Sequence, residues 1–327
     1  MKLKSSIFFI SSPLQAICVE EACHHYNIDK YIIYVLDDGR LYQVIKYLKE
    51  KKMNYVVYDK KNIFFLDLIK GLICYFLPIK KYYDSLFVGN IYMLKYILLF
   101  LPFLRRGACI VQLDDGNIIL KYVNENKRLS RSRELLKKII NILTAIKNIK
   151  SNILFSVFAD ELSNSKYLIE KNSLNLLKSK IHGNNNNVFI IGTFIDEFCH
   201  DFGITRSLFL IKFKLLISEL QKRYPGKKII YIPHGRESNN EDVVLLCKKL
   251  HVDFLKLNEC VEIYFSKLES NPIAVLGFAS SALFTLHIIF KSVPIINIYL
   301  KNSKIVNDEY RVINEVYNRA KIQLLEI

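Results

Sequence analysis

Residues 7–15 read IFFISSPLQ, and this stretch decides the fold class. Its four apolar residues, Ile7–Ile10, have the length of a short buried strand, and Ser11-Ser12-Pro13 supplies turn-forming residues directly after it. The residues that follow, 14–26, have the length and pattern of a helix. A strand, a turn and a helix in this order predict the first unit of a parallel sheet, and therefore an α/β protein.

The same alternation continues through the first half of the chain. Short apolar, β-branched or aromatic runs predict strands, and a second helix-length segment lies at 41–51. The run Gly183–Asn187 is the clearest linker signal, so we expect domains at 1–182 and 183–327. The strands predicted for the first domain are residues 7–10, 31–36, 55–58, 85–88 and 108–113.

After the linker the alternation starts again. Ligands of open parallel sheets bind beyond the carboxyl ends of the strands, so two such halves predict a ligand cleft between them. The strands predicted here are residues 188–191, 228–232, 253–256, 274–276 and 294–298, with helices at 206–223, 241–250 and from 281 onward.

Composition limits the classes of protein and partner. The chain has 327 residues, more than one hydrophobic core needs, and 51% of them are hydrophobic, which excludes disorder. Its 47 Lys and Arg against 31 Asp and Glu give a net charge of +16, which predicts an anionic partner: nucleic acid, anionic lipid or a negatively charged substrate.

The cysteines and the N-terminus indicate a compartment. Seven cysteines without a CxxC pair predict reduced thiols in the cytoplasm, and the short apolar run at 7–10 is not a secretion signal. Cys18, Cys23, His24 and His25 lie close in sequence, but no second cluster completes a zinc site, so we expect no bound metal.

Three segments are unusual in polarity. Residues 63–79 and 91–104 are strongly apolar but are interrupted by charges, so they predict core helices rather than membrane spans; the alternative is a surface that rests on anionic lipid. Residues 121–150 carry nine Lys and Arg against two Glu, which fits a solvated helix face or a patch for anionic lipid or an acidic substrate.

Carboxylates follow one of the first-half strands. Asp114-Asp115-Gly116 comes directly after residues 108–113, and its glycine permits a sharp turn that aims the acids into the cleft. Crowding of two carboxylates raises the pKa of one of them, which suits a general base. The alternative is a polar turn, and Asp37-Asp38-Gly39 repeats the same tripeptide after another strand, so one of the two is expected to be only a turn.

Two constellations follow strands of the second half. Gly192 allows close backbone approach, and Asp196 or Glu197 can reach the cleft, although acids in a first helical turn have a structural explanation too. Pro233-His234-Gly235-Arg236-Glu237 follows residues 228–232. Arg236 can bind phosphate oxygens with its guanidinium, while His234 donates a hydrogen bond or a proton to a leaving phosphate.

A third constellation, Gly277–Leu283, joins a strand to a helix. Ser280, Ser281 and the exposed backbone N–H groups there predict an anion site, with ordinary N-capping as the alternative. No Walker, GxGxxG, HExxH or GxSxG motif is present, and neither is Asp-x-Asp, so we expect a metal-independent protein without a cofactor.

These constellations, in this order and together with Ser11-Ser12-Pro13-Leu14-Gln15, resemble glycosyltransferase family 52, which contains the bacterial lipooligosaccharide sialyltransferases. Leu113–Asn117 is similar to the acidic motif of that family, Ile232-Pro233-His234 to its PH motif, and Phe278–Leu283 to its serine motif. The resemblance implies a GT-B fold of two Rossmann-like domains, with the acceptor bound mainly by the first and CMP-sialic acid mainly by the second.

The resemblance also implies roles for single residues. His234 matches the histidine that serves the departing CMP phosphate, and the family's catalytic aspartate lies in the segment similar to Gly192–Glu197; the spacing departs by one residue, so Asp196 and Glu197 both remain candidates for the base. The donor-binding candidates are Gly192, Pro233, Gly235, Arg236, Ser280 and Ser281, and those on the acceptor side are Gln15, Asp114, Asp115 and Gly116.

The implied reaction is an inverting transfer of sialic acid from CMP-sialic acid to a galactoside of lipooligosaccharide, O-antigen or capsule. One alternative is another donor such as UDP-glucose, and a second is a non-catalytic basic protein that binds polyanions. We expect a cytoplasmic protein, peripheral on the anionic inner membrane of a bacterium, without a nucleic-acid partner. The acceptor, the linkage and the oligomeric state, including a homodimer, are left open.

Overall fold

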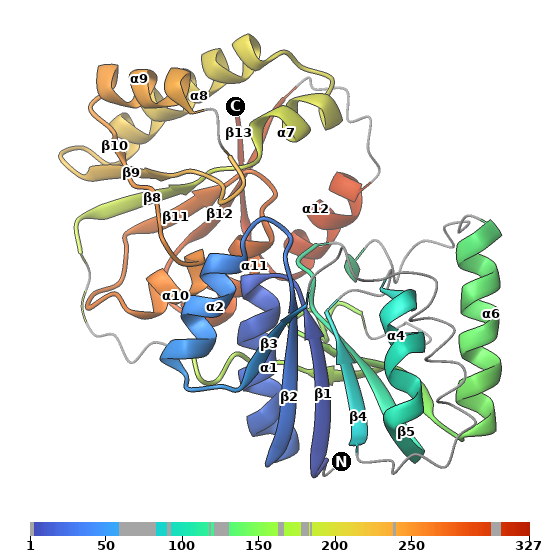
Figure 1. The fold of residues 1–327 in the computed structure, drawn as a ribbon. Coiled ribbons are helices and arrows are strands. Elements are labelled where there is room, and N and C mark those ends of the chain that lie inside the picture. The colour runs from blue at the N-terminus through green and yellow to red at the C-terminus, as the bar shows by residue number, and fades with distance from the viewer. Residues whose placement is uncertain are drawn as a thin grey trace. The chain divides into compact units, whose positions relative to one another are not determined.

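A computed structural model divides the chain into two compact units, Met1–Asn175 and Leu176–Ile327 (Figure 1). Each unit is built on its own parallel sheet, and each is described separately. The structure describes residues 3–58, 83–89, 93–117, 119–120, 131–162, 167–177, 183, 185–237, 240–301 and 309–327.

Unit 1 contains a seven-stranded parallel sheet in the order β3-β2-β1-β4-β5-β6-β7. The chain moves outward from β1 to β3 and then returns to the other side of β1 with β4. Crossovers of one hand therefore place the first helices on one face of the sheet and the later helices on the other. The strands are β1 (Ser5–Ile10), β2 (Lys30–Leu36), β3 (Tyr55–Tyr58), β4 (Tyr83–Val88), β5 (Leu104–Leu113), β6 (Lys150–Ser156) and β7 (Leu168–Lys171), and the helices are α1 (Pro13–Tyr26), α2 (Leu41–Glu50), α4 (Leu94–Phe100), η2 (Leu101–Phe103) and α6 (Arg131–Ile146).

The stretch 7–15 folds as its residue types require. All six residues of β1 are buried, because the strand lies in the middle of the sheet with a neighbour on each side. Ser12 caps α1 by accepting a hydrogen bond from the backbone N–H of Gln15, and the Gln15 side chain returns to the backbone of Ser12. Pro13 stands at the first helical position, where its missing N–H costs no helical hydrogen bond.

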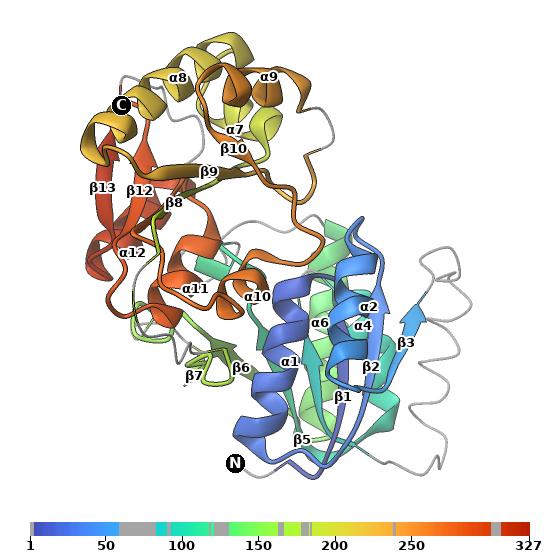
Figure 2. The same cartoon turned by 90° about the vertical axis from the view of Figure 1, so that its left-hand side faces the viewer.

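Unit 2 contains a six-stranded parallel sheet in the order β10-β9-β8-β11-β12-β13. Its first strand, β8, again lies between the two directions in which the sheet grows. Helices α8 and α9 lie side by side in both views (Figure 1, Figure 2). The strands are β8 (Asn187–Ile191), β9 (Lys228–Ile232), β10 (Asp253–Phe254), β11 (Ala274–Gly277), β12 (Ile295–Tyr299) and β13 (Gln323–Glu326), and the helices are α7 (Ile195–Asp201), α8 (Arg206–Arg223), α9 (Glu241–Lys249), α10 (Val261–Ser266), α11 (Ser281–Ile289) and α12 (Glu309–Arg319).

The apolar stretch at 91–104 folds into the core of unit 1. From residue 93 onward its large aliphatic side chains pack against β1, β4 and β5, so the prediction of core structure is confirmed for this part. The stretch at 63–79 lies outside the described residues. None of the helices in the described ranges has the length and apolar character needed to cross a bilayer. The buried members of the second stretch are Leu94, Ile97, Leu98, Phe100, Leu101 and Leu104.

Candidate functional site

Three loops of unit 2 meet at the carboxyl edge of its sheet. Strands β9, β8 and β11 are neighbours and run parallel, so the loops after them, 192–194, 233–237 and 278–280, leave the same edge. The sheet also changes its direction of growth between β8 and β11, and such switch points are where open α/β sheets bind ligands. The three constellations predicted in the second half of the chain thus share one edge of one sheet.

His234 stands in a defined tautomer after β9. Its Nδ1 accepts a hydrogen bond from the backbone N–H of Arg236 at 3.3 Å, so in the neutral ring the proton resides on Nε2. The ring is partly exposed and stacks on Phe194, with 6.3 Å between the centroids. Pro233 before it is buried, which fixes where the loop begins. His234 can therefore offer an Nε2–H donor to an anion at this edge.

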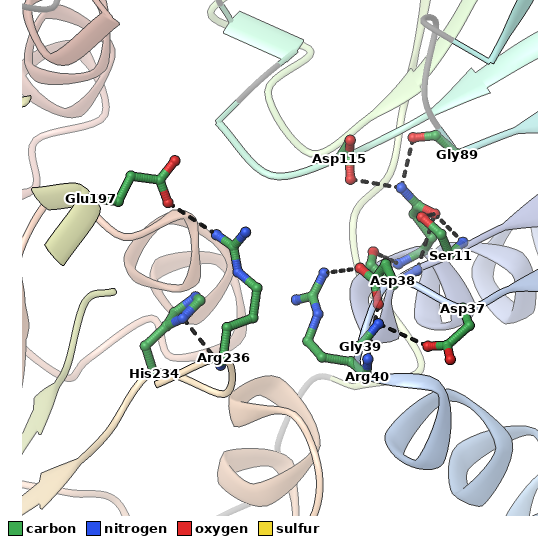
Figure 3. A network of polar contacts seen from close by, with 12 residues as sticks. Ser11, Asp37, Asp38, Gly39, Arg40, Gly89, Asp115, Glu197, His234 and Arg236 are labelled. Atoms are coloured by element: carbon green, nitrogen blue, oxygen red, sulfur yellow. Dashed lines mark hydrogen bonds and ion pairs between the residues drawn. The ribbon is translucent and has the colours of Figure 1, made fainter. Parts of the chain in front are cut away.

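The two acids at the start of α7 point to different partners. An oxygen of Glu197 lies 3.4 Å from Nη2 of Arg236, whose guanidinium also lies over the Phe194 ring, 5.3 Å from its centroid. Figure 3 shows Glu197 directed toward Arg236, with His234 beside them. Asp196 instead accepts a hydrogen bond from Nη1 of Arg206 at 2.9 Å. Glu197, His234 and Arg236 therefore form one group, and Asp196 belongs to another.

The group that holds Asp196 joins the first turns of three helices. Arg206, at the start of α8, donates two hydrogen bonds to Asp242 of α9, at 2.7 and 2.9 Å. Asp242 is the largest cause that raises the pKa of Arg206, and the same pairing lowers the pKa of Asp242. Arg206 also lies 3.7 Å from the buried carboxylate of Glu237. Nothing in the residue pattern marked Arg206, because its partners are distant in sequence.

Glu237 fastens the β9 loop to the start of α7. Its side chain is 1% exposed, and its carboxylate accepts the backbone N–H of Ile195 at 2.8 Å. Burial raises the pKa of Glu237, while the Ile195 N–H and Arg206 oppose that rise. Glu237 is the last residue of the constellation predicted after this strand, but the sequence assigned it no role.

The structure requires glycine at position 192 for a reason that differs from the predicted one. Its N–H donates to the carbonyl oxygen of Ile232 at 2.7 Å, and an added Cβ would lie 2.5 Å from the hydroxyl of buried Tyr231. The close backbone approach that we expected is therefore an approach to β9 of the same sheet. Gly235 lies in the exposed part of the next loop.

The loop between β11 and α11 is held from behind by β12 and α12. Ala279 has a φ of +47°, and its N–H donates to the side-chain oxygen of Asn297 at 2.9 Å. The Tyr317 hydroxyl donates to the carbonyl oxygen of Ser280 at 2.6 Å. Ser280 is the N-cap residue of α11, but its side chain makes no capping hydrogen bond, so ordinary capping does not explain it. Ser280 and Ser281 are both partly exposed.

Sequence reasoning missed Asn297 and Tyr317. Asn297 is 2% exposed inside the apolar strand β12, and a buried amide in such a strand must find hydrogen-bond partners. That pattern was the signal that could have drawn attention to it. Tyr317 lies on α12, which the residue pattern did not reveal.

In unit 1, Gln15 lies at the centre of a network that links three strand ends. Its amide nitrogen donates to the carbonyl oxygen of Gly89 at 2.8 Å and to Asp115 at 2.7 Å, while its oxygen accepts the N–H of Ser11 at 2.7 Å (Figure 3). Gln15 is fully buried. A Cβ on Gly89 would lie 2.1 Å from the Gln15 oxygen, so only glycine leaves room for this amide.

Asp114 corrects an expectation about the acidic motif. It is fully buried and accepts hydrogen bonds from the Ser156 hydroxyl at 2.6 Å and the Val157 N–H at 2.8 Å, so it joins the ends of β5 and β6 and does not point outward. Burial raises the pKa of Asp114 to about 7, and the charge of Asp115 is the smallest contribution. The pKa is raised as expected, but desolvation rather than crowding is the main cause.

The second copy of the tripeptide forms a local turn. Asp37 accepts the N–H of Gly39 at 2.8 Å, and Asp38 accepts the N–H and the guanidinium of Arg40 at 3.1 and 2.6 Å. Gly39 and Gly116 both adopt positive φ, at 95° and 63°. The two tripeptides therefore share a turn-forming glycine, while only Asp114 is anchored to a distant strand.

Two of the four residues that were considered as metal ligands have other partners. Cys18 is buried, and its Sγ accepts a hydrogen bond from the Asn172 amide at 3.4 Å, while His25 pairs with Glu170. Within the part of the chain that the structure describes, no group of three or more His, Cys, Asp or Glu side chains is placed to hold a metal ion.

Comparison with known proteins identifies the fold. No protein-family model and no curated protein sequence matches the chain. Its structure is similar to a 2,6-sialyltransferase of Photobacterium sp. JT-ISH-224, crystallised with CMP and lactose, at a TM-score of 0.55 and 12% identity, covering 99% of this chain and 78% of that chain. It is also similar to the sialyltransferase of Photobacterium damsela, at 0.53 and 12%, covering 99% and 81%.

A third similar structure is HepE of Anabaena in complex with UDP and glucose, at a TM-score of 0.50 and 11% identity, covering 90% of this chain and 80% of that chain. At these identities the likeness shows the fold alone. The chain has an α/β fold of the GT-B type. The strand–helix alternation predicted the α/β class, and the family resemblance implied the GT-B type.

Proposed function

We propose that the protein is an inverting glycosyltransferase that moves sialic acid from CMP-sialic acid to a galactoside of a cell-surface glycan. The observation that carries the proposal is the group of His234, Arg236 and Glu197 at the carboxyl edge of the unit 2 sheet, with the His234 ring oriented to donate from Nε2. The GT-B fold supports it, and so does the likeness to two sialyltransferases, one of them bound to CMP and lactose.

In this proposal the phosphate of the donor binds between the histidine and the serine loop. His234 donates from Nε2 to a phosphate oxygen of the departing CMP, and Arg236 neutralises its charge. Ser280, Ser281 and the first backbone N–H groups of α11 supply further donors. Gly192, Pro233 and Gly235 shape the loops that present these groups, and no metal or cofactor takes part.

Glu197 is the better placed of the two candidate bases. Its contact with Arg236 is a half-exposed ion pair, which contributes about 0–1 kcal/mol and yields readily to a competing anion. Binding of the donor phosphate to Arg236 would release the Glu197 carboxylate to accept the proton of the attacking sugar hydroxyl. Asp196 is held by Arg206, which also anchors α8 to α9, so we assign it a positioning role.

The base assignment is tested by two isosteric variants. Glu197→Gln should lower kcat with CMP-sialic acid by about 10²–10⁴, the usual contribution of a general base, while Asp196→Asn should cost much less. Initial rates on a galactoside panel measure both. The reverse order of effects would move the base to Asp196, and normal rates in both variants would refute the reaction chemistry proposed here.

The role of His234 has a matched control in the same unit. His234→Ala should lose most transfer activity, because the leaving phosphate loses its Nε2–H donor. His200→Ala, at a histidine whose side chain is 84% exposed on α7, should leave the rate unchanged. Circular dichroism checks that both variants are folded. Equal rates for the two variants would contradict the assignment.

A second candidate function keeps the reaction type and changes the donor. The likeness to HepE, crystallised with UDP and glucose, favours UDP-glucose as the alternative. Incubation with each donor, followed by detection of released CMP or UDP and mass spectrometry of the product, separates the two. Release of neither nucleotide, with retained binding of polyanions, would indicate the non-catalytic alternative.

On the acceptor side we place the half-buried carboxylate of Asp115 and the Gln15 network that holds it. Asp114 and Gly116 fix the turn that presents Asp115. The lipid-linked or anionic character of surface glycans suits a protein of net charge +16 that is peripheral on the inner membrane. Association into a homodimer stays a prediction.

A further inference from the structure

Helices α8 and α9 of unit 2 present aliphatic side chains to solvent. On α8, Leu208, Ile211 and Leu215 are 39%, 58% and 56% exposed, and their spacing of three and four residues places them on one stripe. The opposite side of α8 is buried in the unit 2 core through residues such as Phe209 and Phe213. The exposed stripe is therefore additional to the face that the fold itself uses.

Helix α9 also presents aliphatic side chains to solvent. Val244 and Leu245 are 39% and 59% exposed, while Val243 and Cys247 of the same helix are buried. The two helices lie side by side (Figure 2), and paired hydrogen bonds between Arg206 and Asp242 join their first turns. We call the five exposed aliphatic side chains, Leu208, Ile211, Leu215, Val244 and Leu245, the α8–α9 patch.

The charges around the patch are mainly positive. The two helices carry five exposed cations and two exposed acids, which gives a net charge of +3. Two more exposed lysines, Lys227 and Lys228, follow α8 directly, and Lys228 pairs with the exposed Asp253 at 2.7 Å. The cations are Lys214, Lys222, Arg223, Lys248 and Lys249, and the acids are Glu219 and Glu241.

We propose that the α8–α9 patch docks on an anionic lipid surface, with its aliphatic side chains entering the interface and the lysines contacting the headgroups. Apolar area combined with basic residues is the pattern of interfacial membrane helices. A second copy of this chain fits less well, because symmetric pairing would bring the same cations together. Nucleic acid fits less well too, because five aliphatic side chains offer neither stacking nor hydrogen bonds to bases.

This inference is independent of the proposed reaction. It also differs from the lipid surfaces considered from the sequence, which used the apolar stretches 63–79 and 91–104 and the basic segment 121–150 of the first half of the chain. The part of those apolar stretches that the structure describes is packed in the unit 1 core. The structure thus points to a surface in unit 2 that the sequence pattern did not reveal.

The test uses the full chain and vesicles of two compositions, phosphatidylcholine alone and equal parts of phosphatidylcholine and phosphatidylglycerol. The protein should co-sediment with the anionic vesicles, and added salt should weaken binding because it screens the headgroup charge. The double variant Ile211→Gln with Leu215→Gln should weaken binding by at least about tenfold, because two side chains no longer bury apolar area. Both positions are exposed, so the fold should be retained.

A matched control lies on α6 of unit 1. Ile142 and Ile146 are 61% and 59% exposed, and Ile142→Gln with Ile146→Gln removes the same chemistry elsewhere. This variant should bind as the unchanged protein does, and Lys248→Glu with Lys249→Glu should lose the preference for anionic vesicles.

Three results would overturn the proposal. The first is absence of binding to anionic vesicles. The second is a loss of binding that follows the α6 pair and not the α8 pair. The third is a dimer in light scattering that the α8 pair dissociates, because the patch would then be the contact between two copies.

Discussion

Asp114 is a buried carboxyl group whose protonated form fits its surroundings. With the proton on the oxygen that faces Ser156, it can donate to that hydroxyl while the other oxygen accepts the Val157 N–H at 2.8 Å. The Ser156 oxygen also accepts the N–H of Phe158 at 3.1 Å, so it tolerates a change in the direction of its own proton. This arrangement explains how a carboxyl group remains in the core with a pKa raised to about 7.

The shift predicts the pH dependence of stability. Between the ordinary value of 3.8 and about 7 the folded protein holds a proton that the unfolded chain has lost. The Asp114 contribution to the free energy of unfolding therefore falls as pH rises through this window, by at most about 1.4 kcal/mol per pH unit, and is constant above it. Asp114→Asn imitates the protonated form and cannot titrate, so its stability relative to the unchanged protein should rise from pH 4 to 7.

Urea unfolding at a series of pH values measures this difference. Asp160→Asn, at a carboxylate whose side chain is 69% exposed, is the control and should follow the unchanged protein throughout. A difference for Asp114→Asn that is independent of pH would mean that the group is ionised in the folded state across the window.

The two Asp-Asp-Gly tripeptides show what the sequence can and cannot predict for single residues. Their glycines indicated turns, and both turns are present. Whether the first aspartate lies in a local turn or is buried and hydrogen-bonded to another strand depends on its partner. For Asp114 that partner is Ser156, 42 residues away, and no sequence pattern connected the two residues. The same limit applies to Glu197, whose partner Arg236 is 39 residues distant.

At the scale of elements, Gln15 connects α1 with the ends of β1, β4 and β5. It is fully buried, and its amide is engaged by Ser11, Gly89 and Asp115. Gly89 lets the amide approach the β4 end, where a Cβ would collide with three atoms of the Gln15 side chain. The fold therefore explains the segment Pro13-Leu14-Gln15 without any ligand.

A double-mutant cycle tests this connection. Gly89→Ala should destabilise the protein by about 1–3 kcal/mol, because the methyl group displaces a buried, hydrogen-bonded amide. In a Gln15→Ala background the same substitution should cost much less, since the colliding side chain is gone. Denaturant unfolding of the four proteins gives the coupling. Additive costs would show that the Gln15 amide does not determine the requirement for glycine.

Most of the elements were predictable because short apolar runs typical of strands alternate with helix-length segments along the chain. The predicted spans at 55–58, 206–223 and 228–232 agree with β3, α8 and β9. The residue pattern did not reveal β6, β7, β13, α10 and α12. β7 and β13 are edge strands with exposed residues, so their sequences lack the continuous apolar run that marked the central strands.

At the scale of the whole molecule, the repeated strand–helix alternation was sufficient to predict two α/β halves. The order of strands within each sheet was not, because it depends on which crossovers reverse direction, and the residue pattern carries no signal for that reversal. The reversal matters for function, since it occurs beside β1 in unit 1 and beside β8 in unit 2. Gln15 follows β1, and Asp115 follows β5, two strands away in the sheet. The unit 2 candidates follow β8 and its neighbours β9 and β11, whereas the cleft expected between the two halves stays a prediction.

The division of work between the units can be tested by hydrogen exchange. If unit 2 binds the donor, CMP should slow amide exchange in residues 192–197, 233–237 and 278–281, because these loops leave the same edge of the sheet. Lactose, as a galactoside, should slow exchange around Gln15 and Asp115 in unit 1. Each ligand binds only the folded state, so protection of these loops should exceed the general stabilisation measured in helix α6. CMP protection confined to unit 1 would reverse the assignment of the two units, and uniform protection throughout the chain would mean that the ligand acts on global unfolding and not on these loops.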